Sequence, residues 1–180
     1  MNKTAGLFLL VALSVMLCGC PFDSHFSIDE SPAVPVDESL IGKWATMVKK
    51  PGFDGLERQD PMKLIIEKAS DLEYSIALTG RLTELKRFGL VQDDSIKARA
   101  FLSEIAGYRF LNIQINNRYY FAQVKEEGKK LSLLMLRQNF TPRFIKHPAD
   151  LRNAILFHYK TVQEPFYDEW CNLTNLQRVN

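Results

Sequence analysis

The stretch from Tyr119 to Leu136 reads YYFAQVKEEGKKLSLLML and has a strand–turn–strand pattern. Tyr119 to Lys125 and Leu131 to Leu136 are the two apolar arms, and Glu126 to Lys130 between them supplies a glycine for the positive backbone angle of a tight turn. The stretch therefore predicts a β-hairpin, and the neighbouring segments extend it on both sides.

Toward the N-terminus the dominant period stays at two. Tyr108 to Ile115 is predicted to pair with the Tyr119 strand through Asn116-Asn117, because asparagine tolerates left-handed geometry. Ser95 to Ile105 fits a strand better than the alternative, a short helix. Leu72 to Thr79 alternates apolar and polar residues, and Met62 to Lys68 precedes it as the other arm of a hairpin. Several short strands at close spacing predict an antiparallel meander that curls into a sandwich or barrel.

After Arg137 the pattern changes to a helical one. Pro148 and Asp150 stand where a helix would begin, and an amphipathic helix of about twelve residues is predicted, with an apolar face formed by Leu151, Ala154, Ile155, His158 and Tyr159. Glu164 to Asn180 is less regular, and its apolar anchors are Phe166, Tyr167, Trp170 and Leu173. The fold class is therefore mainly β, with a helix near the C-terminus.

Two resemblances refine this fold class. Leu40-Ile41-Gly42-Lys43-Trp44 resembles the Gly-x-Trp opening of lipocalin-type barrels, in which the tryptophan plugs the closed end and an arginine near the last strand stacks on it. The resemblance implies a lipocalin-like barrel with Trp44 and Arg178 as a barrel-closing pair. The alternative is that Trp44 is an ordinary core residue.

Residues 39–180 as a whole resemble a group of uncharacterised bacterial proteins, many of them lipoproteins. The matching stretches are Leu40 to Trp44, Ile96 to Leu102, Gly107, Phe110-Leu111-Asn112, Leu131 to Leu136 and Leu151 to Tyr159. Asn112 replaces the acidic residue of that pattern. The resemblance implies the β fold and no particular activity.

The N-terminus resembles a bacterial lipoprotein precursor. Lys3 precedes an apolar run from Ala5 to Leu17, too short to span a bilayer of ~30 Å. The run ends in Leu17-Cys18-Gly19-Cys20, which resembles a lipobox. The resemblance implies that residues 1–19 are a signal peptide, that Cys20 is lipidated, and that the membrane is a partner through this anchor. Pro21 stands where an aspartate would favour the inner membrane, so we expect the outer membrane, facing the periplasm.

Residues 21–38 contain three prolines, five acidic residues and no basic residue, a composition that predicts a flexible tether. The alternative is an irregular strap that docks on the domain through Phe22, Phe26, Ile28, Val34 and Val36. The β-rich globular domain is then expected over 39–180. With Cys18 removed and Cys20 lipidated, Cys171 is the remaining thiol, so no disulfide is expected within the chain.

Candidate chemistry is sparse. His25, His147, His158 and Cys171 show no metal-ligand spacing, so no metal or other cofactor is expected. Cys171, His158 and Asp168 are conceivable as a catalytic group, but a lone thiol fits a small buried hydrophobe better, and His158 fits a packing residue. A hydrolase-type carboxylate pair is a further alternative, because carboxylate separation cannot be read from sequence. We therefore expect no catalytic residues.

Charge and composition limit the partners. The chain has 180 residues, 46% of them hydrophobic, and a formal charge of only +2, which argues against nucleic acid. Basic stretches at 81–99, 129–130 and 137–146 fit a solubilising face, or alternatively contact with anionic lipid. Phe101, Phe110, Tyr119, Phe121 and Met135 either fill the core or line a ligand cavity. The expected function is a lipid-anchored, non-catalytic binding or interaction module with an envelope protein as partner; the alternative is a lipocalin-like binder of a small apolar ligand.

Overall fold

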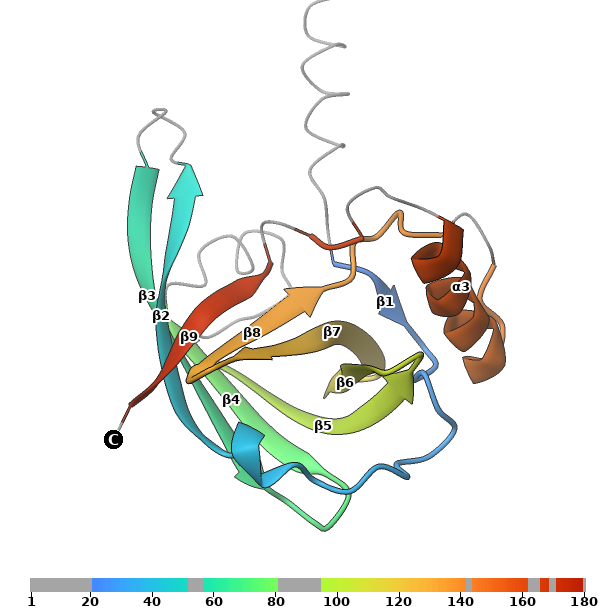
Figure 1. The fold of residues 1–180 in the computed structure, drawn as a ribbon, viewed down its shortest axis with the longest axis horizontal. Coiled ribbons are helices and arrows are strands. Elements are labelled where there is room, and N and C mark those ends of the chain that lie inside the picture. The colour runs from blue at the N-terminus through green and yellow to red at the C-terminus, as the bar shows by residue number, and fades with distance from the viewer. Residues whose placement is uncertain are drawn as a thin grey trace, which may run out of the picture.

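An eight-stranded antiparallel β-barrel forms the body of the protein (Figure 1). The computed structural model describes residues 21–51, 57–80, 95–141, 144–161, 166–168 and 171–179. The strands are β1 (Asp23–Ser24), β2 (Gly42–Pro51), β3 (Glu57–Lys68), β4 (Tyr74–Gly80), β5 (Ser95–Ile105), β6 (Tyr108–Ile115), β7 (Arg118–Glu127), β8 (Lys130–Met135) and β9 (Leu173–Val179). The short 3-10 helix η1 (Glu38–Leu40) precedes the barrel, and helix α3 (Pro148–Thr161) lies between β8 and β9.

The strands follow one another around the ring as they do in the chain. β2 to β8 form an up-and-down meander, and β9 returns between β8 and β2 to close it. Successive connections therefore lie at alternate ends of the barrel. We call the end with η1 and the β3–β4, β5–β6 and β7–β8 turns the plug end. The other end, with the β2–β3, β4–β5, β6–β7 and β8–β9 connections, is the far end.

Turn chemistry places the strands where the sequence predicts them. Glu127 pairs with Lys130 across the β7–β8 turn, where Gly128 has a φ of 62°. Asn116 has a φ of 54° between β6 and β7, which confirms its left-handed conformation. Residues 95–105 are extended as β5, as predicted. The predicted mainly β fold is confirmed, and the meander closes as a barrel rather than a sandwich.

The sequence pattern does not predict β9, which completes the barrel. This strand pairs Arg178 with Trp44 of β2 and Leu176 with Leu131 of β8. Within β9 only Leu176 is buried, so the apolar–polar alternation that marks a half-buried strand is missing. The expectation of an irregular tail from Glu164 to Asn180 is therefore wrong for residues 173–179.

Apolar side chains pack on both faces of the barrel wall. The interior cluster includes Leu40, Trp44, Leu64, Ile66, Tyr74, Leu102, Leu111, Leu131 and Leu176. The outer cluster lies between the wall and α3 and includes Ile28, Ile105, Phe110, Phe121, Leu136, Phe140, Leu151, Ile155 and Phe166. Because neighbouring strand residues point to opposite faces, β6 supplies Phe110 to the outer cluster and Leu111 to the interior one.

Residues 21–40, which we call the strap, dock on the barrel. β1 pairs with β7 through Asp23↔Tyr120 and Ser24↔Tyr119, and Ile28 is buried in the outer cluster. Further along, Val36 donates its N–H to the Asp71 carbonyl at 2.9 Å. The structure therefore corrects the expectation of a flexible tether over 21–38, and the docked alternative describes this segment.

The folded unit consequently includes residues 21–38 as well as the domain expected over 39–180. Apolar residues along the strap cover surfaces of the barrel that would otherwise be exposed, and this burial offsets the entropy of ordering an acidic, proline-rich chain. The predicted signal peptide, residues 1–19, and the predicted lipidation site, Cys20, lie outside the described residues.

Candidate functional site

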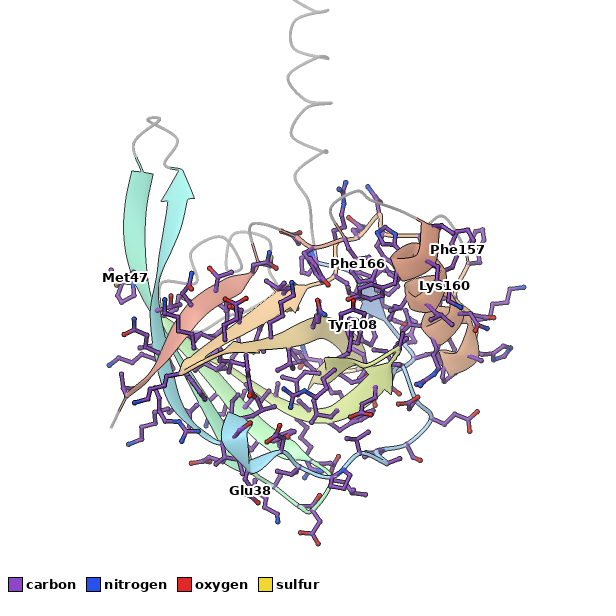
Figure 2. The ribbon with its side chains drawn as sticks, in the orientation of Figure 1. Glu38, Met47, Tyr108, Phe157, Lys160 and Phe166 are labelled. Atoms are coloured by element: carbon purple, nitrogen blue, oxygen red, sulfur yellow. The ribbon has the colours of Figure 1, made fainter. Side chains whose placement is uncertain are left out.

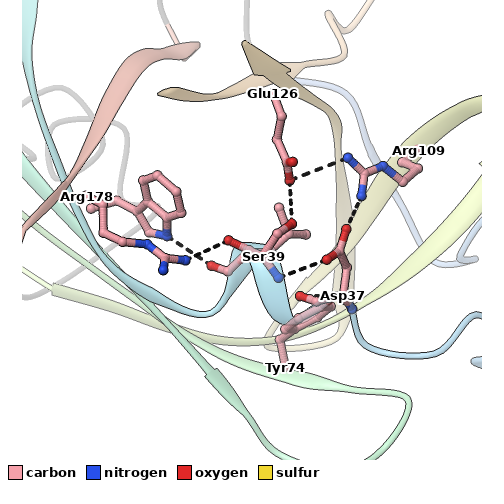
Figure 3. Close-up of polar contacts among 8 residues, drawn as sticks. Asp37, Ser39, Tyr74, Arg109, Glu126 and Arg178 are labelled. Atoms are coloured by element: carbon pink, nitrogen blue, oxygen red, sulfur yellow. Dashed lines mark hydrogen bonds and ion pairs between the residues drawn. The ribbon is translucent and has the colours of Figure 1, made fainter. Parts of the chain in front are cut away.

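Trp44 and Arg178 meet at the plug end of the barrel (Figure 3). The Trp44 side chain is 6% exposed, and its indole N–H donates to the Leu40 carbonyl at 2.9 Å. The Arg178 guanidinium lies over the indole, with 5.0 Å between its central carbon and the ring centroid. It also donates to the Ser39 and Ile41 carbonyls at 2.7 and 2.8 Å. The structure thus brings together the two residues that the Gly-x-Trp resemblance implied.

Gly42 makes this approach of the arginine possible. Its φ of 149° is unfavourable for residues with a side chain, and an added Cβ would lie 3.4 Å from Nε of Arg178. The glycine of the Gly-x-Trp opening therefore has a local steric role. Because this position has no side chain, the guanidinium can contact the Ser39 and Ile41 carbonyls and the Trp44 indole at the same time.

An ion-pair network surrounds η1 at the plug end (Figure 3). Arg109 pairs with Asp37, and its other terminal nitrogen lies 3.4 Å from Glu126. Ser39 donates its N–H to the Asp37 carboxylate at 2.9 Å and its hydroxyl to Glu126 at 2.9 Å. The buried Tyr74 hydroxyl accepts from the Asp37 N–H at 2.6 Å. These contacts join the strap to β4, β6 and β7.

The protonation of Asp37 follows from this network. Burial raises the pKa of the carboxyl, but hydrogen bonds from Ser39 and the Arg109 guanidinium outweigh burial and leave the pKa below its usual value. A carboxyl with a lowered pKa holds no proton near neutral pH, so Asp37 is unsuited to act as a general acid. Asp37 and Glu126 share a guanidinium, and this arrangement fits a structural latch.

Along the strands, interior residues are less completely buried near the far end than near the plug end. Within the strands, the half-buried members of the interior cluster are Leu78, Ala98, Ile113, Met135 and Leu173. Each of them stands at the far end of its strand: late in β4, β6 and β8, and early in β5 and β9. The fully buried members lie nearer the plug. Among the described strand residues, the half-buried apolar side chains of the interior cluster thus lie at the far end, and Val34, Val36 and Ile41 before β2 are half-buried as well.

The aromatic residues considered as cavity linings lie on the other side of the wall. Phe110 and Phe121 belong to the outer cluster, and Tyr119 packs against it and near Phe101, with 6.5 Å between the ring centroids. Only Met135 of the five candidates packs against the interior cluster. The core interpretation therefore holds for Phe110 and Phe121, in the outer core rather than inside the barrel.

Asn112 fixes the strap from the outer face of β6. Its side chain is 0% exposed, and Oδ1 accepts from the Ile28 N–H at 2.7 Å. Its amide nitrogen donates to the Ser103 hydroxyl at 2.8 Å and to the Phe101 carbonyl at 3.3 Å. An aspartate at this position could accept from the Ile28 N–H but as a carboxylate could donate to neither partner.

A second polar chain runs under α3. The Tyr159 and Tyr167 hydroxyls lie 2.8 Å apart, and Tyr167 donates to the buried Gln123. Burial raises the pKa of Tyr159, and its contact with Tyr167 raises it further. The Tyr159 ring also stacks on Tyr108, with 4.5 Å between the ring centroids. These hydroxyls are neutral at physiological pH and link α3 to β7.

The residues weighed as a catalytic group take structural positions. Asp168 and Cys171 share a turn, where the Cys171 N–H lies 3.2 Å from the Asp168 carboxylate. His158 packs on Phe166, with 4.4 Å between the ring centroids, and its Nε2 is buried without a hydrogen-bond partner among the described residues. Within the described ranges, no cluster of three or more histidine, cysteine or acidic side chains has the arrangement of a metal site.

Sequence reasoning missed the latch and the Asn112 site. Asp37 is the N-cap of the short 3-10 helix Glu38–Leu40, and an aspartate in this position is a sequence signal that could have indicated an ordered turn. Arg109, Glu126 and Ile28 gave no such signal, because their partners are 72 to 87 residues away in the chain.

The fold defines the chain as an up-and-down β-barrel protein in which Trp44, Arg178 and the contacts of Asp37 close the plug end. The chain matches no family model, and comparisons with curated proteins and with solved structures give no match. Among the described residues, no helix has both the length and the hydropathy needed to cross a membrane.

Proposed function

We propose that this chain is a lipid-anchored protein of the bacterial cell envelope whose barrel is a non-catalytic binding module for a small apolar molecule. The observation that carries the binding proposal is the difference between the two ends. Trp44, Arg178 and the Asp37 latch close one end, whereas Leu78, Ile113 and Met135 offer apolar surface at the other. A barrel closed at one end and apolar at the other suits a ligand that enters from a single side.

The anchor is proposed from Leu17-Cys18-Gly19-Cys20 and the apolar run before it. The proposed location is the outer membrane, facing the periplasm, because Pro21 follows the cysteine. Two or three acyl chains on Cys20 would hold the protein at the membrane, since each buried methylene contributes about 0.8 kcal/mol.

Native mass spectrometry of the full chain, extracted from membranes of producing cells in mild detergent, tests both parts. We expect a polypeptide that begins at Cys20 and carries acyl chains, together with a stoichiometric small apolar molecule. Retention of residues 1–19 without acyl chains contradicts the anchor. A lipidated chain without a ligand contradicts the ligand proposal and favours an envelope protein partner, which we expected from the sequence.

A pair of variants locates the ligand. Ile113→Asp places a charge among the half-buried interior residues, whereas Gln114→Asp places the same charge on the opposite face of β6. Loss of the copurified molecule from the first variant and its retention in the second would support binding inside the far end. Equal retention in both would place the ligand elsewhere.

A further inference from the structure

The strap fixes the point at which the chain enters the barrel. Pro21 forms a bridge with Arg137, just beyond the end of β8, and the Phe22 N–H donates to the Leu136 carbonyl at 2.7 Å. The Phe22 ring packs edge-on against Phe140, with 4.7 Å between the centroids. The chain is therefore held to the barrel from the first residue that the structure describes.

This entry point belongs to the far end. β8 runs away from the β7–β8 turn of the plug end, so Leu136 and Arg137 lie at the opposite end. Figure 1 shows β1 beginning beside the end of β8, on the side toward which the β2–β3 hairpin projects. Figure 2 labels Met47 on the arm of that hairpin and Glu38 on the plug, well away from it.

We propose that the far end of the barrel lies directly against the bilayer that holds the lipid on Cys20. This inference rests on the proposed lipid anchor. Cys20 is joined directly to Pro21, a step of about 3.8 Å between Cα atoms, whereas the eighteen-residue tether that the sequence suggested would reach ~60 Å. An acylated cysteine at the headgroup level therefore brings the far end to the membrane surface.

The chemistry of the surface near the entry point fits a phospholipid surface. Phe144 is 90% exposed and lies four residues beyond Phe140, in the connection between β8 and α3. The described part of that connection, 137–141 and 144–147, contains Arg137 and Lys146 and no acidic residue. Anionic headgroups attract nearby basic side chains, and an exposed phenylalanine beside them can enter the interface.

In this orientation the half-buried interior residues of the far end face the membrane. Leu78, Ile113 and Met135 stand at the end that faces the lipid, while the plug faces water. An apolar ligand would then pass between bilayer and barrel without crossing the aqueous phase, where its solubility is low. The ligand source is thus the membrane rather than the surrounding solution.

Quenching by brominated lipid tests the orientation in the full lipidated chain. Phe144→Trp and Met47→Trp add a fluorophore near the far end, and Glu38→Trp adds one at the exposed plug as the matched control. Each protein is reconstituted into vesicles of phosphatidylglycerol and phosphatidylcholine, with or without bromine on the phosphatidylcholine acyl chains. Emission of the unsubstituted protein, which has two tryptophans, is subtracted.

We expect the added emission of Phe144→Trp to fall about twofold in brominated vesicles, because a side chain at the headgroup–acyl boundary meets the bromines. Met47→Trp should be quenched in the same sense, and Glu38→Trp should be unchanged. Equal quenching at Glu38, or no quenching at Phe144 in a lipidated and vesicle-bound protein, overturns the orientation. A chain that carries no lipid and stays in solution instead contradicts the proposed anchor, so the two failures are distinguishable.

Discussion

The hydrogen bonds of Asn112 predict a large effect of a small substitution. In Asn112→Ala the Ile28 N–H loses its buried acceptor, and the Ser103 hydroxyl and Phe101 carbonyl lose a donor. An unsatisfied buried N–H costs about 1–3 kcal/mol, and the small cavity left by the side chain adds to that cost. We expect the free energy of unfolding to fall by about 3 kcal/mol, a large share of the ~5–15 kcal/mol typical of a domain.

Two measurements check this value. In a chain of this length about 3 kcal/mol lowers the melting temperature by roughly 6–12 °C, and urea unfolding gives the free energy directly. Hydrogen exchange at the Ile28 amide should quicken, because the strap opens there first. Asn153→Ala on the exposed face of α3 is the control, with an expected change within about 0.5 kcal/mol. A loss below about 0.5 kcal/mol in Asn112→Ala, with Ile28 still protected, refutes the reasoning.

Three further predictions follow from the plug and from β4. Arg178→Ala should cost about 1–2 kcal/mol and change Trp44 emission, because two carbonyls and the indole lose the guanidinium; an unchanged urea midpoint would contradict this. Asp37 has a lowered folded pKa, so its contribution is present above the unfolded value of about 3.9 and lost as pH falls through the folded value. Asp37→Asn should therefore lower stability by up to about 1 kcal/mol at pH 7, and in urea titrations its stability should converge with that of the unsubstituted protein as pH falls below the folded pKa of Asp37. Gly80→Ala should cost about 2 kcal/mol or more, because the new Cβ would lie 2.6 Å from the Pro61 carbonyl at a φ of 147°. Gly128→Ala, with open space around it, should cost only about 1 kcal/mol in the same denaturation assay.

The strands that the sequence predicts share one physical property. Each of β4, β6, β7 and β8 has a local alternation or a turn residue that specifies it without reference to distant partners. β9 has neither, because it is held by backbone pairing to β2 and β8 and buries only Leu176. A closing strand of this kind depends on edges supplied by the rest of the barrel, and those edges are not visible in its own residues.

For the strap, the sequence composition predicted a flexible tether where the structure has a docked segment. Its prolines and acidic residues indicate a solvated chain, yet Asp29 pairs with Arg152 at 2.6 Å and Asp37 with Arg109. The charges that suggested solvation are used in long-range pairs, and Ile28 enters a core made by α3 and the barrel wall. Composition describes the average behaviour of a segment, whereas docking depends on complementary groups 72 or 123 residues away.

The strap links the stability of the barrel to its position on the membrane. It begins at the far end with Pro21, crosses the outer wall at Ile28, and ends as the plug at Leu40. If the strap detached as far as Ile28, the eight residues from Cys20 to residue 27 would become a spacer of up to about 26 Å, enough to lift the barrel from the headgroups. Asn112→Ala combined with Phe144→Trp should therefore show less quenching by brominated lipid than Phe144→Trp alone. Unchanged quenching in a combined variant that is destabilised but still folded would mean that the contacts of Pro21 and Phe22 are sufficient to hold the far end against the membrane.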